Sequence, residues 1–185
     1  MSLLAVLRGH VPADAAERAD LDRIVSFAQN HRDPFDRRIL EGHLTGSAVV
    51  VSADGASVLL LHHRKLERWL QPGGHAEPGE GSGEAVALRE AREETGISGL
   101  WLHPTAPRPL DVDVHDIPAR RDEPAHQHLD LRYLVLAPSG ATGQRLVAEA
   151  RALRWFGWDQ LETLDLDSGL VRALGKARAI LRGEV

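Results

Sequence analysis

Three glutamates and two arginines are crowded into the segment ALREAREETG, residues 87–96. On a helix with about 100° between successive residues, Glu90, Glu93 and Glu94 fall within an arc of about 100°. Like charges spaced three or four residues apart destabilise an isolated helix by about 0.2–0.5 kcal/mol per pair. We therefore expect a cationic partner beside this helix face, where it would offset the repulsion between the carboxylates.

The composition limits the classes of protein to which the chain could belong. Its 185 residues carry a net charge of -5 and 43% of them are hydrophobic, which fits one globular domain. The sequence has no cysteine, so it has no disulfide, thiolate zinc site or thiol nucleophile. The mild acidity gives no electrostatic support for binding long nucleic acid. MSLLAVLRGH does not resemble a signal peptide and no segment reaches transmembrane length, so we expect a cytoplasmic protein without a membrane partner.

Helical and extended segments follow one another without the regular order of a doubly wound fold. A helix is predicted from Pro12 to about His31, and another from about Ser168, because apolar residues recur there at helical spacing. Strands are predicted in SAVVV, SVLLLHH, GLWLH, LDVDVHDI, HLDLRYLVLA and RWFGW. A loop rich in Gly and Pro leads into the glutamate helix, which Gly96 is expected to end. The pattern predicts an α+β fold with a mixed β-sheet between helices.

The glutamate segment and the loop before it resemble the signature of the Nudix hydrolases, G-x5-E-x7-R-E-U-x-E-E-x-G-U, in which U is aliphatic. The matching residues are Gly74, Glu80, Arg89, Glu90, Ala91, Glu93, Glu94, Gly96 and Ile97. Eight residues separate Glu80 from Arg89, where the signature has seven. An extra residue inside the helix would rotate the carboxylates by about 100°, so we expect it in Gly81-Ser82-Gly83, before the helix begins.

The resemblance implies a fold and an activity. The fold would be a Nudix-type α/β/α sandwich at residues 43–185, preceded by an N-terminal helical extension at residues 1–42. The activity would be cleavage of a nucleoside diphosphate linked to another moiety, by water attack on phosphorus. The substrate would thus be a small-molecule diphosphate, and the cofactor Mg²⁺ or Mn²⁺.

The resemblance also implies roles for individual residues. Glu90, Glu93 and Glu94 would be the metal ligands. Arg89 would hold Glu80 bidentately and brace the loop against the helix. The remaining glycines of the signature region, Gly73 and Gly74, would allow the backbone to turn tightly where a side chain would clash. The general base and the number of metal ions are not assigned.

Several alternatives stay open. A hydrolase of a non-nucleotide diphosphate would use the same glutamates. A ligand-sensing Nudix relative without catalysis usually lacks some of these glutamates, all of which are present here. An isopentenyl diphosphate isomerase relies on a cysteine, which this chain does not have. The identity of the substrate and a homodimer formed through the N-terminal helix are also left open.

Two polar rows outside the signature are further candidates for substrate binding. Each row alternates with apolar residues and so shares one strand face: Asp111, Asp113 and His115 in the first, and His126, His128, Asp130 and Arg132 in the second. We predict that the two strands pair antiparallel and line the substrate cleft beside the glutamate helix, where they would bind the substrate, hold a catalytic water or add a metal ligand. Imidazole would then titrate near neutrality, and kcat/KM should fall as pH drops through about 6–7. The other interpretation is an exposed or scaffold face.

Trp69 and Arg64, just before the Gly-rich loop, are weaker candidates. Trp69 could stack on a base, although simple packing is the alternative. Arg64 belongs to a short basic cluster that could steer phosphate to the site or could be a solvated turn. His43, in EGHLTG, has no assignment from the sequence.

Overall fold

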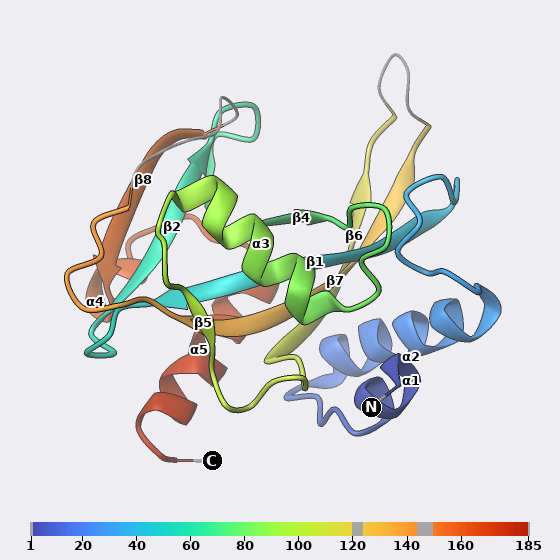
Figure 1. Cartoon of the computed structure of the whole chain (residues 1–185), viewed down its shortest axis with the longest axis horizontal. Coiled ribbons are helices and arrows are strands. Elements are labelled where there is room, and N and C mark those ends of the chain that lie inside the picture. The colour runs from blue at the N-terminus through green and yellow to red at the C-terminus, as the bar shows by residue number, and fades with distance from the viewer. Residues whose placement is uncertain (1, 120–123, 144–149, 185) are drawn as a thin grey trace.

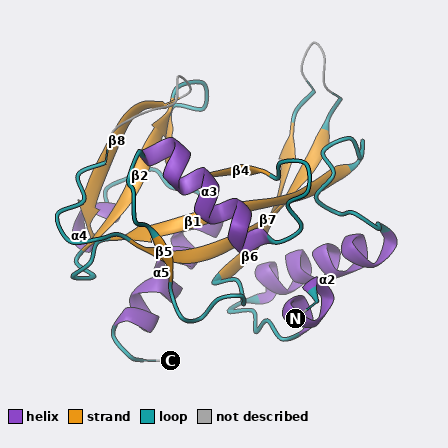
Figure 2. Cartoon of the chain, viewed as in Figure 1, coloured by secondary structure: helices purple, strands orange, loops and turns teal. Residues whose placement is uncertain are grey.

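The computed structural model describes residues 2–119, 124–143 and 150–184, which form a mixed β-sheet with helices on both faces (Figures 1 and 2). The helices are α1 (Leu3–Arg8), α2 (Ala15–Asn30), α3 (Gly83–Thr95), α4 (Trp158–Leu161) and α5 (Ser168–Leu181). The strands are β1 (Gly42–Val51), β2 (Ser57–His63), β3 (Arg68–Leu70), β4 (Gly73–His75), β5 (Trp101–Leu102), β6 (Asp111–Ile117), β7 (His126–Leu136) and β8 (Ala150–Gly157). The predicted α+β fold, with a mixed sheet between helices, is confirmed.

The centre of the sheet is the parallel pair of β1 and β7, in which Gly42 aligns with Gln127 and Val51 with Leu136. The short strand β4 pairs antiparallel with β1, although its residues were predicted to lie in a loop. Strand β6 pairs antiparallel with β7, as predicted. Part of the connection between β6 and β7, residues 120–123, lies outside the described residues. β2 pairs with β1, β3 and β8, while β5 pairs with β7. Strands β4, β1, β7 and β6 therefore lie side by side and bring four separate segments together.

Helices α3 and α5 cover opposite faces of this sheet (Figure 1). A Cβ placed on Gly46 of β1 would lie 2.6 Å from the Gly83 carbonyl oxygen in α3, so the glycine allows close packing of helix on strand. Because neighbouring strand residues point to opposite faces, Thr45 of β1 faces away from α3. On that second face Gly169 of α5 lies against the Asp113 carboxylate.

Each face of the sheet has its own apolar core. The core on the α3 face also includes residues of α1 and α2, such as Leu7 and Ile24, which are fully buried. The core on the α5 face is built around Leu60 of β2 and Leu170 of α5. The predicted N-terminal helix is confirmed as α2, whereas α1 was not predicted. No helix among the described residues is both long and apolar enough to span a membrane.

Glu17 of α2 ties the N-terminal helices to the rest of the domain. Its carboxylate is fully buried and accepts hydrogen bonds from the Lys176 Nζ of α5 and from the Val112 N–H of β6, the latter at 3.3 Å. It also lies 2.7 Å from Nε2 of His10. Burial opposes ionisation, but hydrogen bonds from His10 and Lys176 hold the pKa of Glu17 well below its ordinary value. A buried ionised carboxylate thus joins α2, β6 and α5.

The start of α3 differs from the sequence prediction. Gly83 is the first residue of the helix and Ser82 is its N-cap, so the prediction that all of Gly81-Ser82-Gly83 precedes the helix is wrong for Gly83. A Cβ on Gly83 would lie 2.8 Å from the Tyr133 hydroxyl oxygen and from Cδ1 of Leu131. A Cβ on Gly81 would meet nothing within 4 Å. The exposed residues before Ser82 are therefore where a loop of different length is accommodated.

Candidate active site

Helix α3 directs its glutamates toward strand β4. The helix buries Val86, Ala87, Ala91 and Thr95 against the sheet. It ends at Gly96, which adopts the left-handed conformation at φ 64° and donates its N–H to the Arg92 carbonyl oxygen at 2.9 Å. Because the apolar side of the helix is fixed in this way, Glu90 and Glu94 on its other side face Gly73 and Gly74 of β4.

The two glycines of β4 are in direct contact with two of the glutamates. The Gly73 N–H donates to Oε2 of Glu94 at 2.9 Å. A Cβ on Gly74 would lie 2.5 Å from Oε1 of Glu90, so a side chain here would displace that carboxylate. The Glu90 side chain is 16% exposed, and burial raises its pKa above the ordinary value. The predicted role of the glycines, close approach without a side chain, matches this geometry.

Arg89 joins the loop to the helix. Its Nε donates to both carboxylate oxygens of Glu80, at 3.1 and 3.2 Å, and its Nη2 donates to Oε2 of Glu80 at 3.0 Å. Nη2 also donates to the His75 carbonyl oxygen at 2.6 Å. The hydrogen bonds from Arg89 lower the pKa of Glu80. The extra residue between Glu80 and Arg89 therefore does not prevent the predicted bracing contact.

The same arginine faces the other glutamates. Nη1 of Arg89 lies 2.8 Å from Oε2 of Glu93 and 3.2 Å from Oε1 of Glu90. The cationic partner expected from the crowded charges is thus supplied in part by the chain itself. The Glu93 side chain is 53% exposed, and its carboxylate retains lone pairs for a further ligand.

The donor set suits Mg²⁺ or Mn²⁺. Glu90, Glu93 and Glu94 offer only oxygen donors, which hard divalent cations prefer. A positive charge beside the half-buried Glu90 carboxylate would also favour its ionised form, which burial alone disfavours. The residues present therefore fit a hard divalent cation.

Comparison with known proteins establishes the family. Residues 42–174 match the family model described as NUDIX domain. The chain belongs to the Nudix family. A curated relative from Bacillus subtilis, named "Putative 8-oxo-dGTP diphosphatase", is 31% identical over 110 residues. The aligned part is 60% of this Nudix chain and 64% of the relative, so it spans slightly less than two thirds of that protein.

Two solved structures share the fold of this Nudix protein. A hydrolase of the NUDIX family from Clostridium perfringens is 26% identical, with a TM-score of 0.55, and the match covers 75% of this chain and 97% of that one. An Ap4A hydrolase from C. elegans is 21% identical, with a TM-score of 0.60, and the match covers 76% and 98% of the two chains. The α/β/α architecture of the Nudix family is therefore present here.

The two predicted polar rows lie side by side in this Nudix fold, but on the face of the sheet that α5 covers, so the prediction that they lie beside the glutamate helix is wrong. Asp113 pairs with Asp130 and His115 with His128 in the β6–β7 ladder. At the end of the rows nearest α5, Arg132 is 3% exposed and lies 3.0 Å from Asp113 and 3.3 Å from Asp130. These two aspartates are therefore held by an arginine inside the fold. Asp130 also accepts hydrogen bonds from two β1 hydroxyl groups, those of Thr45 and Ser47, at 2.9 and 2.6 Å.

The opposite end of the rows is a cluster of imidazoles. His128 of β7 is surrounded by His43 of β1, His75 of β4, His115 of β6 and His126 of β7, with ring centroids 4.8 to 5.4 Å from its own. No role was predicted from the sequence for His43 or for His75. The one available signal was the position of His75 immediately after the glycines of the signature.

The sequence led us to expect a pKa near neutrality for the row histidines, and His128 does not have one. Burial, reinforced by the neighbouring histidines, lowers the pKa of His43 to about 4 and that of His128 still further. Burial also opposes protonation of His115, but its hydrogen bond to Asp113 raises the pKa of His115 overall. The expectation that His128 titrates between about pH 6 and 7 is therefore wrong, because burial and the neighbouring histidines disfavour its protonated form.

The weaker candidates lie on β3 and in the turn that joins β2 to β3. Trp69 of β3 packs edge-on against Phe156 and His62, with ring centroids 4.7 and 5.0 Å apart. Arg64 is exposed in the turn that follows β2. The packing of Trp69 agrees with the simpler of its two interpretations.

Proposed function

We propose that this protein is a divalent-metal-dependent pyrophosphohydrolase that cleaves a nucleoside diphosphate linked to another moiety by water attack on phosphorus. The observation that carries the proposal is the placement of Glu90 and Glu94 beside the β4 glycines, with Glu93 held by Arg89, in a chain of the Nudix family. The Arg89–Glu80 contact supports it, because it holds the loop against the glutamate helix.

The roles of the chain's own residues follow from their contacts. Glu90, Glu93 and Glu94 would hold Mg²⁺ or Mn²⁺, which when bound would neutralise phosphate charge and lower the pKa of water. The Gly73 N–H orients the Glu94 carboxylate, and Arg89 orients Glu93. The general base stays unassigned, because Glu90, Glu93 and Glu94 are close together and each carries a carboxylate that could accept a proton from water.

The relative from Bacillus subtilis supports a nucleotide substrate, since its name describes a nucleoside triphosphate derivative. A non-nucleotide diphosphate remains the main alternative, because the glutamates recognise only the diphosphate part. A non-catalytic ligand sensor is the second alternative. We propose one catalytic domain at residues 43–185 with an N-terminal extension at residues 1–42, and a cytoplasmic location. Long nucleic acid is not a proposed partner, and a homodimer is left to measurement.

We propose that the face carrying the polar rows lines the substrate cleft. Its candidates are Asp113, His115, His126, His128 and Asp130, with Trp69 and Arg64 as more distant possibilities. His115 is the most accessible of the row members, with 45% of its side chain exposed. It is therefore the row residue best placed to reach a bound molecule, whereas the two aspartates are committed to Arg132.

A panel assay tests the proposed function. Purified protein would be incubated with nucleoside triphosphates, ADP-ribose, nucleotide sugars, dinucleoside polyphosphates and prenyl diphosphates, each with Mg²⁺ and with EDTA. We expect metal-dependent release of a nucleoside monophosphate from at least one nucleotide. Cleavage of the prenyl compound alone would favour the non-nucleotide alternative. Saturable binding of a panel member without any turnover would favour the sensor.

A further inference from the structure

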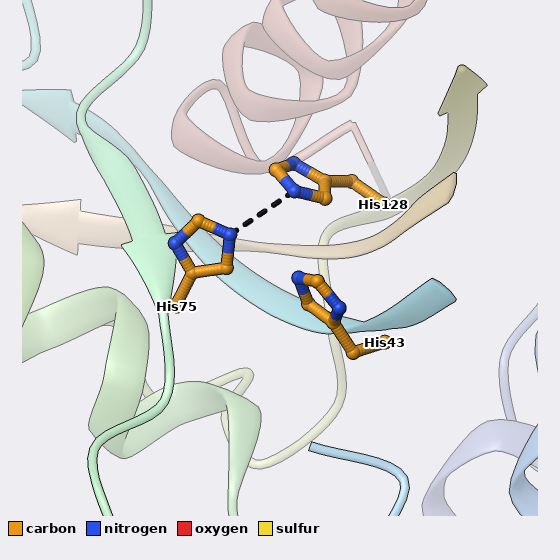
Figure 3. A group of neighbouring side chains, drawn as sticks. All are labelled: His43, His75 and His128. Carbon is orange, nitrogen blue, oxygen red and sulfur yellow. Dashed lines mark hydrogen bonds between the residues drawn. The ribbon is translucent and has the colours of Figure 1, made fainter. Parts of the chain in front are cut away.

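Three histidines from three strands converge on one point in the structure. His43 of β1, His75 of β4 and His128 of β7 each offer a ring nitrogen, and these nitrogens all lie within 4.8 Å of one another (Figure 3). Nε2 of His75 lies 3.1 Å from Nε2 of His128. In Figure 3 the ring of His43 lies beneath this pair. The arrangement places three potential nitrogen ligands around a common centre.

His43 is the decisive member of this group. Its side chain is 1% exposed, yet neither of its ring nitrogens has a hydrogen-bond partner among the described residues. Buried polar atoms in native proteins are nearly always paired with protein, water or an ion. A buried donor or acceptor that is left unpaired destabilises the folded state. The position of His43, against His75 and His128, therefore indicates that another species completes the cluster.

The packing of the cluster favours a metal ion over an anion. The rings of His43, His75 and His128 lie against one another with centroids 4.8 to 5.0 Å apart, and positive charges on imidazoles packed this closely would repel one another. A neutral imidazole cannot attract phosphate by charge, but its unprotonated nitrogen is a metal ligand. Around a tetrahedral Zn²⁺ with Zn–N bonds of about 2.0–2.1 Å, the ligand nitrogens are about 3.4 Å apart. In the absence of an ion, Nε2 of His75 and Nε2 of His128 are hydrogen-bonded at 3.1 Å, and the nitrogens of the three rings lie within 4.8 Å of one another, so small movements of the side chains would bring them to this separation.

A fourth imidazole, that of His126, lies against this group. It stacks on His43 with ring centroids 5.1 Å apart, its Nε2 lies 3.3 Å from Nε2 of His128, and its Nδ1 lies 3.0 Å from the Pro124 carbonyl oxygen. His75 and His128 are only partly buried, so one side of the group is open to solvent. Three protein ligands and one accessible position form the pattern of an open zinc site.

We propose that His43, His75 and His128 bind one divalent transition-metal ion, with Zn²⁺ as the preferred species, at a site separate from the glutamates of α3. The separation follows from strand geometry: Gly74 faces Glu90, while the next residue, His75, points to the opposite face of β4. Imidazole suits Zn²⁺ and related ions, whereas Mg²⁺ prefers oxygen. The two sites therefore select different metals.

The site would fix β4 in place. This strand is three residues long and is paired to β1 at three positions. An ion shared by His43, His75 and His128 would clamp β4 to both central strands. Because Gly73 and Gly74 precede His75 directly, the same clamp would hold the turn against Glu90 and Glu94. The inference does not rest on the proposed hydrolysis, since it concerns metal binding alone.

Metal titration of the full-length chain, prepared without a histidine tag and stripped with a chelator, tests the proposal. Zn²⁺ and Co²⁺ would be added in excess Mg²⁺, which occupies carboxylate sites. We expect one Zn²⁺ per chain, with a Kd on the order of 1 µM or lower, and the visible absorption of four-coordinate Co²⁺. His43→Ala should weaken binding by at least about 100-fold, whereas His103→Ala, which removes a histidine outside the cluster, should not change it.

Two further variants keep the result interpretable. His128→Gln preserves bulk and polarity at a partly exposed position, so it tests the site if His43→Ala does not fold. Glu93→Gln should bind Zn²⁺ as tightly as the wild type. If the wild type shows no saturable Zn²⁺ binding, or if His43→Ala and His128→Gln both bind Zn²⁺ with the wild-type affinity, the proposal is overturned. Hydrolysis measured in Mg²⁺ on the same samples would show separately whether the proposed function holds.

Discussion

Substituting Gly74 by alanine should impair catalysis far more than it impairs folding. Gly74 pairs with Gly46 in the β4–β1 ladder and does not have a positive φ, so the backbone accepts an alanine. The new methyl group would lie 2.5 Å from Oε1, 2.7 Å from Cδ and 3.0 Å from Oε2 of Glu90. The three atoms nearest to it therefore all belong to one carboxylate.

The size of the effect follows from these distances. Ordinary contact begins at 3.4 Å, so Oε1 of Glu90 must move by about 0.9 Å. A displacement of about 1 Å in a catalytic group can cost about 10²-fold in rate, or about 2.7 kcal/mol of transition-state stabilisation. The carboxylate is the end of a flexible chain, and an off-rotamer side chain costs only about 0.5–1.5 kcal/mol. The melting temperature should accordingly fall by no more than a few degrees.

The assay compares kcat/KM and thermal unfolding of Gly74→Ala with those of the wild type, using the best substrate from the panel at saturating Mg²⁺. Gly81→Ala is the matched control, because a Cβ there meets nothing within 4 Å. We expect a loss of about 10²-fold in Gly74→Ala and wild-type kcat/KM in the control. Wild-type kcat/KM in Gly74→Ala would refute the reasoning, since the displaced carboxylate would then have no role in the reaction.

Three other predictions concern the helix, the buried charge network and the metal. Gly83→Ala should lower the free energy of unfolding by about 1–3 kcal/mol through overpacking against Tyr133, measured by urea unfolding beside Gly81→Ala; equal stability of the two would contradict the packing. Glu17→Gln should destabilise the protein by about 3 kcal/mol at pH 7, because it removes the buried charge that accepts a hydrogen bond from Lys176 and leaves this lysine with Asp111 alone as a charged partner, at 3.4 Å. The folded-state pKa of Glu17 is depressed, so this difference should shrink as pH falls below about 4.3, and a difference independent of pH would argue against it. Hydrolysis should vanish in EDTA and return with Mg²⁺ or Mn²⁺, and activity that persists in EDTA would exclude the proposed cofactor.

The glutamate helix and its arginine were accessible from the sequence, because helix geometry fixes the relative directions of residues three and four positions apart. The contact between Arg89 and Glu80 followed from the family signature in spite of the extra residue. The exact start of the helix could not be predicted, because a glycine at position 83, next to Gly81 and Ser82, is typical of a loop. Its place inside α3 depends on contacts with Leu131 and Tyr133, which lie far along the chain.

The imidazole cluster shows why other features could not be predicted. The pairing of β6 with β7 was foreseeable from two neighbouring strands with a short connection. The parallel pairing of β1 with β7, however, aligns His43 with His128 across more than eighty residues, and no local pattern in the sequence specifies it. The buried ion pair of Glu17 and Lys176 is of the same kind. Each arises from the packing of elements that are distant in sequence.

The rate constant of Glu94→Gln tests the central claim most directly. Glutamine keeps the size of the side chain and can still accept a hydrogen bond from the Gly73 N–H, but it removes the negative charge that a metal ion requires. With the substrate found in the panel and saturating Mg²⁺, we expect kcat to fall by at least about 10³-fold while the far-UV circular dichroism is unchanged. Glu162→Gln, which alters an exposed glutamate after α4, should retain the wild-type kcat. A wild-type kcat in Glu94→Gln would contradict the assignment of the α3 glutamates as the catalytic metal ligands.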